Sequence, residues 1–186
     1  MDIYFWIVGF VIIVYGAIFM SRRKFFIDRR YEFAIFILAL YMVPVMMSLS
    51  INIYIFLLFI LIVSFFRFKG SYTVSNINSE MFEQVLLSIL NERNISYEKQ
   101  KGAVALTGYG DKRITYKQSM NSIDANFKDI YELDLYKTLK EEIKNRIKLI
   151  EERLFPSTGL FYIVIGIVFI VFILFIREQS VCMWRF

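Results

Sequence analysis

The sequence has 186 residues, of which 58% are hydrophobic, and its mean hydropathy is +0.53, whereas a typical globular domain is about 45–50% apolar. The net charge of +5 lies outside residues 71–155, where 13 basic residues balance 13 acidic ones, which argues against a nucleic-acid-binding face on that segment. With no histidine and one cysteine, the chain cannot form Cys/His zinc sites, histidine-dependent triads or intrachain disulfides. We predict no metal, cofactor or catalytic residue.

Residues 3–20 are the first predicted element, an uncharged run of 18 residues that is long enough for one membrane-spanning helix. Residues 21–33 follow as a predicted cytoplasmic loop, because basic residues beside a span favour the cytoplasmic side. Binding of anionic lipid head groups is the alternative role for these basic residues. They are Arg22, Arg23, Lys24, Arg29 and Arg30.

The uncharged segment 34–66 is too long for one span, since a single helix of that length would measure about 50 Å against a hydrocarbon core of about 30 Å. We expect two short spans, at about 33–48 and 52–66, with a kinked or re-entrant hairpin as the alternative. A fourth span is expected at about 159–176. The chain then divides into residues 1–70 with three spans, a cytoplasmic domain at 71–155, and residues 156–186, with both termini outside the cell membrane.

Glycines recur at seven-residue spacing in the first and the fourth predicted span. Gly9 and Gly16 lie in the first, and Gly159 and Gly166 lie in the fourth. Small residues at this spacing allow two helices to approach closely, so we expect these spans to pack against each other in antiparallel orientation. No charged residue lies inside a predicted span, which argues against a secondary transporter.

Residues 71–155 predict an α+β domain with two helices on one face of an antiparallel sheet. A β-branched, alternating segment at 72–76 predicts a strand, and Asn78 or Ser79 is expected to cap a helix that ends near Asn94. Further strands are expected at 95–99, 103–107, 114–118 and 123–127, followed by a long amphipathic helix at 130–155. The predicted fold class is therefore a membrane all-α bundle of four transmembrane helices with an inserted cytoplasmic α+β domain.

Two local patterns were weighed as functional sites. The string 107–111, Thr-Gly-Tyr-Gly-Asp, is similar to the potassium-channel filter signature, but it lies between two alternating runs, where it favours a hairpin turn. A loose acidic cluster surrounds the start of the last predicted helix, where carboxylates favour the helix dipole. Its members are Asp124, Asp129, Glu132 and Asp134.

The composition and the missing catalytic patterns favour a non-catalytic accessory or regulatory membrane protein of the sensor or immunity type. It would present residues 71–155 to a protein partner at the inner membrane surface. The alternatives are a subunit of a pore or transport complex and, more weakly, a membrane-bound enzyme that uses the acidic cluster. Predicted partners are anionic membrane lipids and a protein of unknown identity, with assembly of several copies left open and no nucleic acid.

Overall fold

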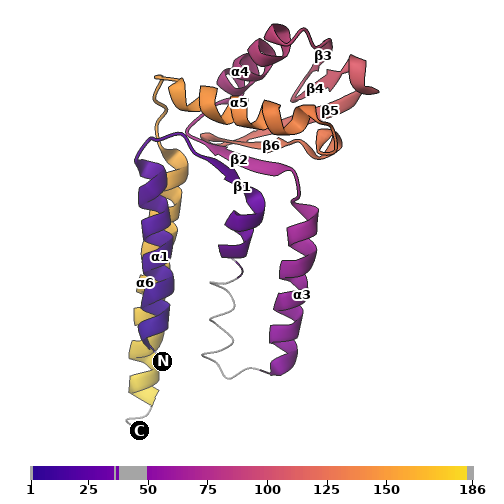
Figure 1. The fold of residues 1–186 in the computed structure, drawn as a ribbon. Helices are drawn as coiled ribbons and strands as arrows, with labels where there is room; N and C mark the ends of the chain where they lie inside the picture. Colours follow the sequence, from indigo (N-terminus) through magenta and orange to yellow (C-terminus); the bar gives the residue numbers. More distant parts are fainter. Residues whose placement is uncertain (1, 36, 38–49, 184–186) are drawn as a thin grey trace.

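The computed structural model describes residues 2–35, 37 and 50–183. A six-stranded antiparallel sheet carries two helices, α4 and α5, on one face, and three further helices, α1, α3 and α6, extend from its other side (Figure 1). The architecture is α+β, because helices and strands occupy separate layers and consecutive strands pair in antiparallel fashion.

The helices and strands follow one another along the chain in an irregular order. They are α1 Asp2–Met20, β1 Phe26–Asp28, α3 Ile51–Arg67, β2 Ser71–Ser75, α4 Ser79–Glu92, β3 Tyr97–Gln100, β4 Ala103–Leu106, the short 3-10 helix η1 Thr107–Tyr109, β5 Lys112–Ser119, β6 Ser122–Asn126, a second 3-10 helix η2 Lys128–Ile130, α5 Leu135–Leu149 and α6 Ser157–Met183. Residues 29–35, directly after β1, are also helical.

The strands lie in the order β1-β2-β6-β5-β4-β3. Successive side chains of a strand point to opposite faces, so β2 directs Tyr72 and Val74 to one face and Thr73 to the other. In the register of β2 with β6, Val74 faces Ile123 and Thr73 faces Asp124. One face of the sheet is therefore apolar, and the opposite face is polar around Thr73 and Asp124.

Helices α4 and α5 bury the apolar face of the sheet. Asn78 caps α4, with its side-chain oxygen accepting from the backbone N–H of Met81 at 2.8 Å, and the helix directs Phe82 and Leu86 into the core. The fully buried apolar side chains of this core are Val74, Ile77, Phe82, Leu86, Ile89, Leu90, Val104, Leu106, Ile114, Ile123, Phe127, Ile130, Leu139, Ile143 and Ile147.

The last helix of this layer is shorter than the predicted helix 130–155. Residues 128–130 form η2, and α5 ends at Leu149, where Ile150 turns into extended backbone. The Nζ of Lys24 donates to the carbonyl oxygens of Ile150 and Glu152, the latter at 2.7 Å. These two carbonyls accept bonds from Lys24 and not from backbone N–H groups of a further helical turn. Helix α5 therefore does not extend as far as α6.

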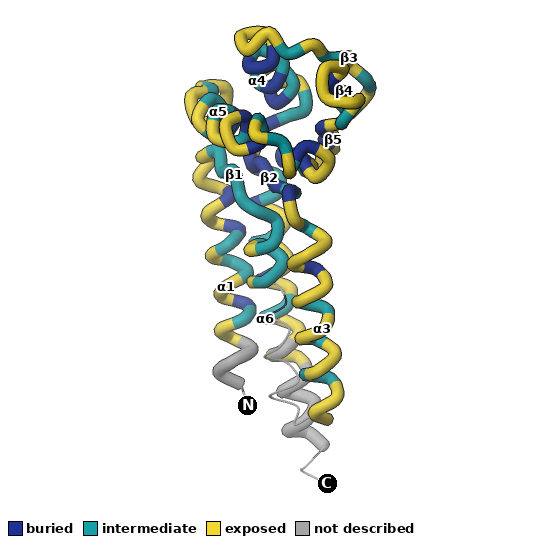
Figure 2. The backbone as a smooth tube through the Cα atoms, turned by 45° about the vertical axis from the view of Figure 1, so that its right-hand side comes forward, coloured by how far each residue is buried: buried dark blue, intermediate teal, exposed yellow. Residues whose placement is uncertain are grey.

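Helices α1 and α6 lie side by side in antiparallel orientation (Figures 1 and 2). A Cβ atom built on Gly16 would lie 2.8 Å from the carbonyl oxygen of Gly159, and one on Gly159 would lie 2.7 Å from the backbone nitrogen of Met20. Only glycine allows the two backbones to come this close. Gly9 and Gly166 lie on the same contact, where an added Cβ would meet isoleucine side chains at 2.6 Å.

In the part of the chain that the structure describes, no helix combines the length and the apolar character needed to cross a membrane. This finding contradicts the predicted four-span bundle and its location in a cell membrane with both termini outside. It also contradicts the membrane-bound accessory function and its pore, transport and enzyme alternatives. Helix α3, for example, has 17 residues and measures about 26 Å, less than the roughly 30 Å of a hydrocarbon core. Most of the predicted span 33–48 lies outside the described residues.

The predicted basic loop also has a different role from the one expected. Its residues 26–28 form the edge strand β1, which pairs with β2. Arg30 binds Asp28 through two nitrogens, and Arg29 forms an ion pair with Asp124 at 2.9 Å. Together with the bonds of Lys24, these contacts show that three of the five basic side chains hold the fold together, while Arg22 and Arg23 are exposed.

Candidate functional site

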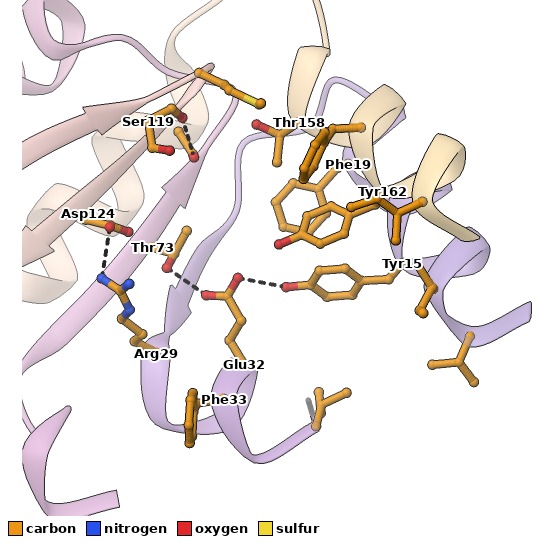
Figure 3. A pocket seen from close by; sticks show the side chains of 17 residues that line it. Tyr15, Phe19, Arg29, Glu32, Phe33, Thr73, Ser119, Asp124, Thr158 and Tyr162 are labelled. Atoms are coloured by element: carbon orange, nitrogen blue, oxygen red, sulfur yellow. Dashed lines mark hydrogen bonds and ion pairs between the residues drawn. The ribbon is translucent and has the colours of Figure 1, made fainter. Parts of the chain in front are cut away.

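A cavity of about 480 Å³ lies where the helix pair α1/α6 meets the polar face of the sheet (Figure 3). Helices α1 and α6 form one wall, residues 29–35 form the second, and strands β2, β5 and β6 close it from the sheet side. Its lining residues are Val11, Ile12, Tyr15, Phe19, Arg29, Glu32, Phe33, Ile35, Thr73, Ser119, Met120, Ser122, Asp124, Thr158, Phe161, Tyr162 and Ile165. Its size falls within the range of about 300–1,000 Å³ typical of small-molecule sites.

Glu32 is the central polar group of the cavity. Its Oε1 accepts a hydrogen bond from the Tyr15 hydroxyl at 3.1 Å, and its Oε2 accepts one from the Thr73 hydroxyl at 2.7 Å. Figure 3 shows these two hydroxyls reaching the carboxylate from different sides. Within the described residues no Lys or Arg forms an ion pair with Glu32. Its negative charge is therefore stabilised there by two neutral hydroxyl donors.

Three aromatic rings form a cluster beside Glu32. The ring centroid of Tyr15 lies 4.8 Å from that of Phe19 and 5.2 Å from that of Tyr162, and Phe19 and Tyr162 are 6.0 Å apart. Burial, and then the negative charge of Glu32, raise the pKa of the Tyr15 and Tyr162 hydroxyls. Both phenols therefore stay protonated near neutral pH, and that of Tyr15 donates its proton to the hydrogen bond with Glu32.

Arg29 and Asp124 form the other charged group of the lining. Their side chains approach to 2.9 Å and are each about one third exposed, and the Arg29 guanidinium lies 5.3 Å from the ring centroid of Phe68. Because the positive charge of Arg29 is matched by Asp124, Arg29 does not compensate the negative charge of Glu32. The three charged lining residues carry a formal net charge of −1.

A pair of buried asparagines holds the walls of the cavity in place. The Nδ2 of Asn121 donates to the Oδ1 of Asn76 at 2.6 Å, and the Oδ1 of Asn121 accepts from the backbone N–H of Thr158 at 2.9 Å. The Nδ2 of Asn76 donates to the carbonyls of Phe19 and Arg23 at 3.2 and 2.7 Å. These two side chains thus connect the end of α1, the start of α6 and the sheet.

A second hollow, beside β3 and β5, is a weaker candidate. It is open and lies around Glu83, Lys99 and Tyr116. The carboxylate of Glu83 already binds the Lys99 ammonium and accepts from the Tyr116 hydroxyl at 2.6 Å. Its charge is therefore balanced within the protein, unlike that of Glu32.

The structure separates the predicted acidic cluster. Asp124 lies in the cavity and pairs with Arg29, whereas Asp129 belongs to η2 and Asp134 is the residue before α5, where its side chain makes no capping bond. Among the residues described, no group of three or more Cys, His, Asp or Glu side chains is placed to hold a metal ion. The predicted hairpin between β4 and β5 is present, with η1 in its turn.

The residues that define the cavity were missed by the sequence analysis. Tyr15, Glu32, Thr73 and Tyr162 come from four separate segments, and no short motif contains two of them. One available signal was Glu32 itself, which is one of two acidic residues in the basic segment 21–33 and has aromatic neighbours on both sides. The glycines singled out for helix packing lie on the α1/α6 contact and position the wall that carries Tyr15 and Tyr162.

Comparison with known proteins gives no relative from which a function could be transferred. No family model matches the chain, and no curated protein and no solved structure is significantly similar to it. The geometry and the charge of the cavity are therefore the observations from which a function can be proposed.

Proposed function

We propose that this protein is a non-catalytic binding protein for a small amphipathic molecule, which it holds in the cavity between the α1/α6 pair and the sheet. The observation that carries this proposal is the division of the cavity into two ends. Glu32, Thr73 and Asp124 supply polar groups on the sheet side, and aliphatic residues such as Val11 and Ile165 supply apolar surface on the helix wall. Binding sites of this kind are mostly apolar with a few well-placed polar groups.

The titratable groups of the cavity favour binding over catalysis. The chain has no histidine, and the second carboxylate of the lining, Asp124, pairs with Arg29, so the described lining offers no second unpaired carboxylate or imidazole for proton transfer beside Glu32. The Tyr15 and Thr73 hydroxyls donate to Glu32 and leave its other acceptor positions open to a ligand. The protein partner expected for residues 71–155, and assembly of several copies, stay predictions.

A matched pair of substitutions on α1 tests the proposed function. Val11 lines the cavity and Val14 does not, yet both are 41% exposed on the same helix. We expect Val11→Trp to fill the cavity and to remove saturable binding of the neutral fluorescent amphiphile N-phenyl-1-naphthylamine. Val14→Trp should leave the wild-type stoichiometry of one site per chain.

The fluorescence titration is run with the purified full chain under identical conditions for all variants. Equal binding to the Val11 and Val14 variants would place the probe on the exposed apolar helix surfaces and would overturn the proposal. The far-ultraviolet circular dichroism of each variant verifies that the fold is intact.

A further inference from the structure

We infer that the molecule held in the cavity is an organic cation, an amine or quaternary ammonium whose charged end lies against Glu32 and whose hydrocarbon part lies along the wall that α1 and α6 form. This inference rests on the proposed function, since it names the chemical class of the ligand for the same cavity. It is drawn from the charge of the lining, from the aromatic cluster and from the position of the aliphatic side chains.

The charge of the cavity lining is unbalanced. Glu32 has only hydroxyl partners among the described residues, and Arg29 is occupied by Asp124. A partly buried carboxylate without a cation is costly, because it loses hydration without gaining an ion pair. A cationic ligand would supply the missing charge, whereas an anionic ligand would add repulsion to Glu32 and Asp124.

The aromatic cluster strengthens the preference for a cation. The negative faces of aromatic rings attract ammonium groups within about 6 Å of the ring centroid, and several rings together are a common way to hold a quaternary ammonium. Tyr15, Phe19 and Tyr162 pack against one another next to Glu32, with ring centroids 4.8–6.0 Å apart. Phe19 is only 1% exposed, so Tyr15 and Tyr162 are the rings that a ligand can contact. The Tyr162 hydroxyl points into the same space in Figure 3.

The hydrocarbon part of the ligand has a defined place as well. Val11 and Ile12 on α1 and Ile165 on α6 line the side of the cavity away from the sheet. A linear alkyl chain against these side chains would remove apolar surface from water, which favours binding. The cavity thus orients the ligand with its head towards the sheet and its tail along the helix pair.

Three probes with the same eight-carbon chain test the inference by titration calorimetry below their micellar concentrations. They are octyltrimethylammonium, octyl glucoside and octyl sulfate, which carry a positive, a neutral and a negative head. We expect the cation to bind at least about 10-fold more tightly than the neutral probe, because its ammonium group meets the negative charge of Glu32 and the tyrosine rings beside it. Octyl sulfate should bind most weakly.

Glu32→Gln keeps the size of the side chain and removes its charge. We expect this variant to bind the cationic and the neutral probe within about 3-fold of each other, while Glu132→Gln, an exposed carboxylate outside the cavity, keeps the wild-type preference. Thr73→Val provides a second variant with the opposite expectation. It removes one hydroxyl donor from Glu32, so the cation should bind several-fold more tightly.

The outcomes separate the inference from the proposed function. If Val11→Trp removes binding of the cationic and the neutral probe but wild-type affinity does not depend on head-group charge, the cationic ligand is refuted and the binding cavity stands. If Val11→Trp changes the affinity for no probe, both are refuted. If Glu32→Gln does not fold, a Thr73→Val variant with unchanged cation affinity would still overturn the inference.

Discussion

The sheet layer and the helices below it contain similar apolar residues but use them in opposite ways (Figure 2). Phe82 of α4 is fully buried, whereas Phe59 of α3 is 62% exposed. In the sheet layer, strand alternation and two amphipathic helices enclose the apolar side chains, so burial stabilises the fold directly. Along α1, α3 and α6 much of the apolar surface faces outwards, and surfaces of this kind mark contact with another apolar partner.

The helix pair is held to the sheet by polar groups. Within the pair, contact depends on close backbone approach at Gly16 and Gly159, and between the pair and the sheet it depends on the buried amides of Asn76 and Asn121. The two regions should therefore respond differently to substitution. The sheet layer should lose stability when side-chain volume is removed, and the helix pair should lose stability when volume is added or a hydrogen bond is removed.

The largest expected effect is loss of volume in the sheet layer. Phe82→Ala should lower the free energy of unfolding by about 3–5 kcal/mol, because it removes a fully buried ring and leaves a cavity. Phe59→Ala on α3 removes the same atoms from an exposed position and should change it by less than about 0.5 kcal/mol. Urea unfolding followed by circular dichroism measures both. Equal losses would show that α3 is as well packed as the core.

The joint between the regions should be the next most sensitive. Asn121→Ala removes the hydrogen-bond partner of the Asn76 Oδ1 and that of the backbone N–H of Thr158. Each buried polar group left unsatisfied costs about 1–3 kcal/mol of stability. Hydrogen exchange should then rise at the end of α1 and the start of α6 while β4 and β5 stay protected. A uniform increase along the chain would contradict a local joint.

Added volume in the helix pair gives a smaller, graded effect. Gly16→Ala should destabilise the pair by about 1–3 kcal/mol, since overpacked atoms must shift and the obstacles to its Cβ are backbone atoms of Gly159 and Ile163. Gly9→Ala should cost less, because its Cβ meets the end of the flexible Ile170 side chain. Gly108→Ala, with nothing within 4 Å, is the control. If thermal unfolding showed a larger loss of stability for Gly9→Ala than for Gly16→Ala, the result would count against this contact.

The smallest effect concerns pH in the sheet layer. Hydrogen bonds from Lys99 and Tyr116 lower the pKa of Glu83 below its ordinary value of 4.5. A carboxylate with a lowered folded-state pKa contributes stability that is present above its unfolded pKa and is lost as the pH falls through the folded value. Glu83→Gln should therefore flatten the loss of stability below about pH 4.5, by on the order of 0.5 kcal/mol for a partly exposed pair. If Glu83→Gln left the dependence of stability on pH unchanged, Glu83 would not contribute to the loss of stability in acid.

Local patterns predicted the elements of the sheet layer well, because alternation and capping act over a few residues. The strand at 71–75 and the cap at Asn78 are examples. Strand β1 was missed because three residues carry too short a pattern, and its pairing with β2 joins segments about 45 residues apart. The apolar helices were expected, but hydropathy alone led to a membrane assignment that the described helices contradict.

The candidate site was beyond sequence reasoning for a related reason. Glu32 becomes a binding group only when Tyr15, Thr73 and Tyr162 meet around it. That meeting depends on the register of β2, on the glycine contact of α1 with α6 and on the asparagine pair. Each of these is a tertiary contact between distant segments, and none leaves a periodic trace in the sequence.

The antiparallel pairing of α1 with α6 has a consequence for the newly made chain. The end of α1 at Met20 and the start of α6 at Ser157 are 137 positions apart. At a synthesis rate of ~5–20 residues per second, synthesis of α6 begins roughly 7–30 s after α1 is complete. During this interval strands β3 to β6, each of which pairs with its neighbour in the sequence, can assemble first. Helix α1 is therefore packed after strands that are made later than it is.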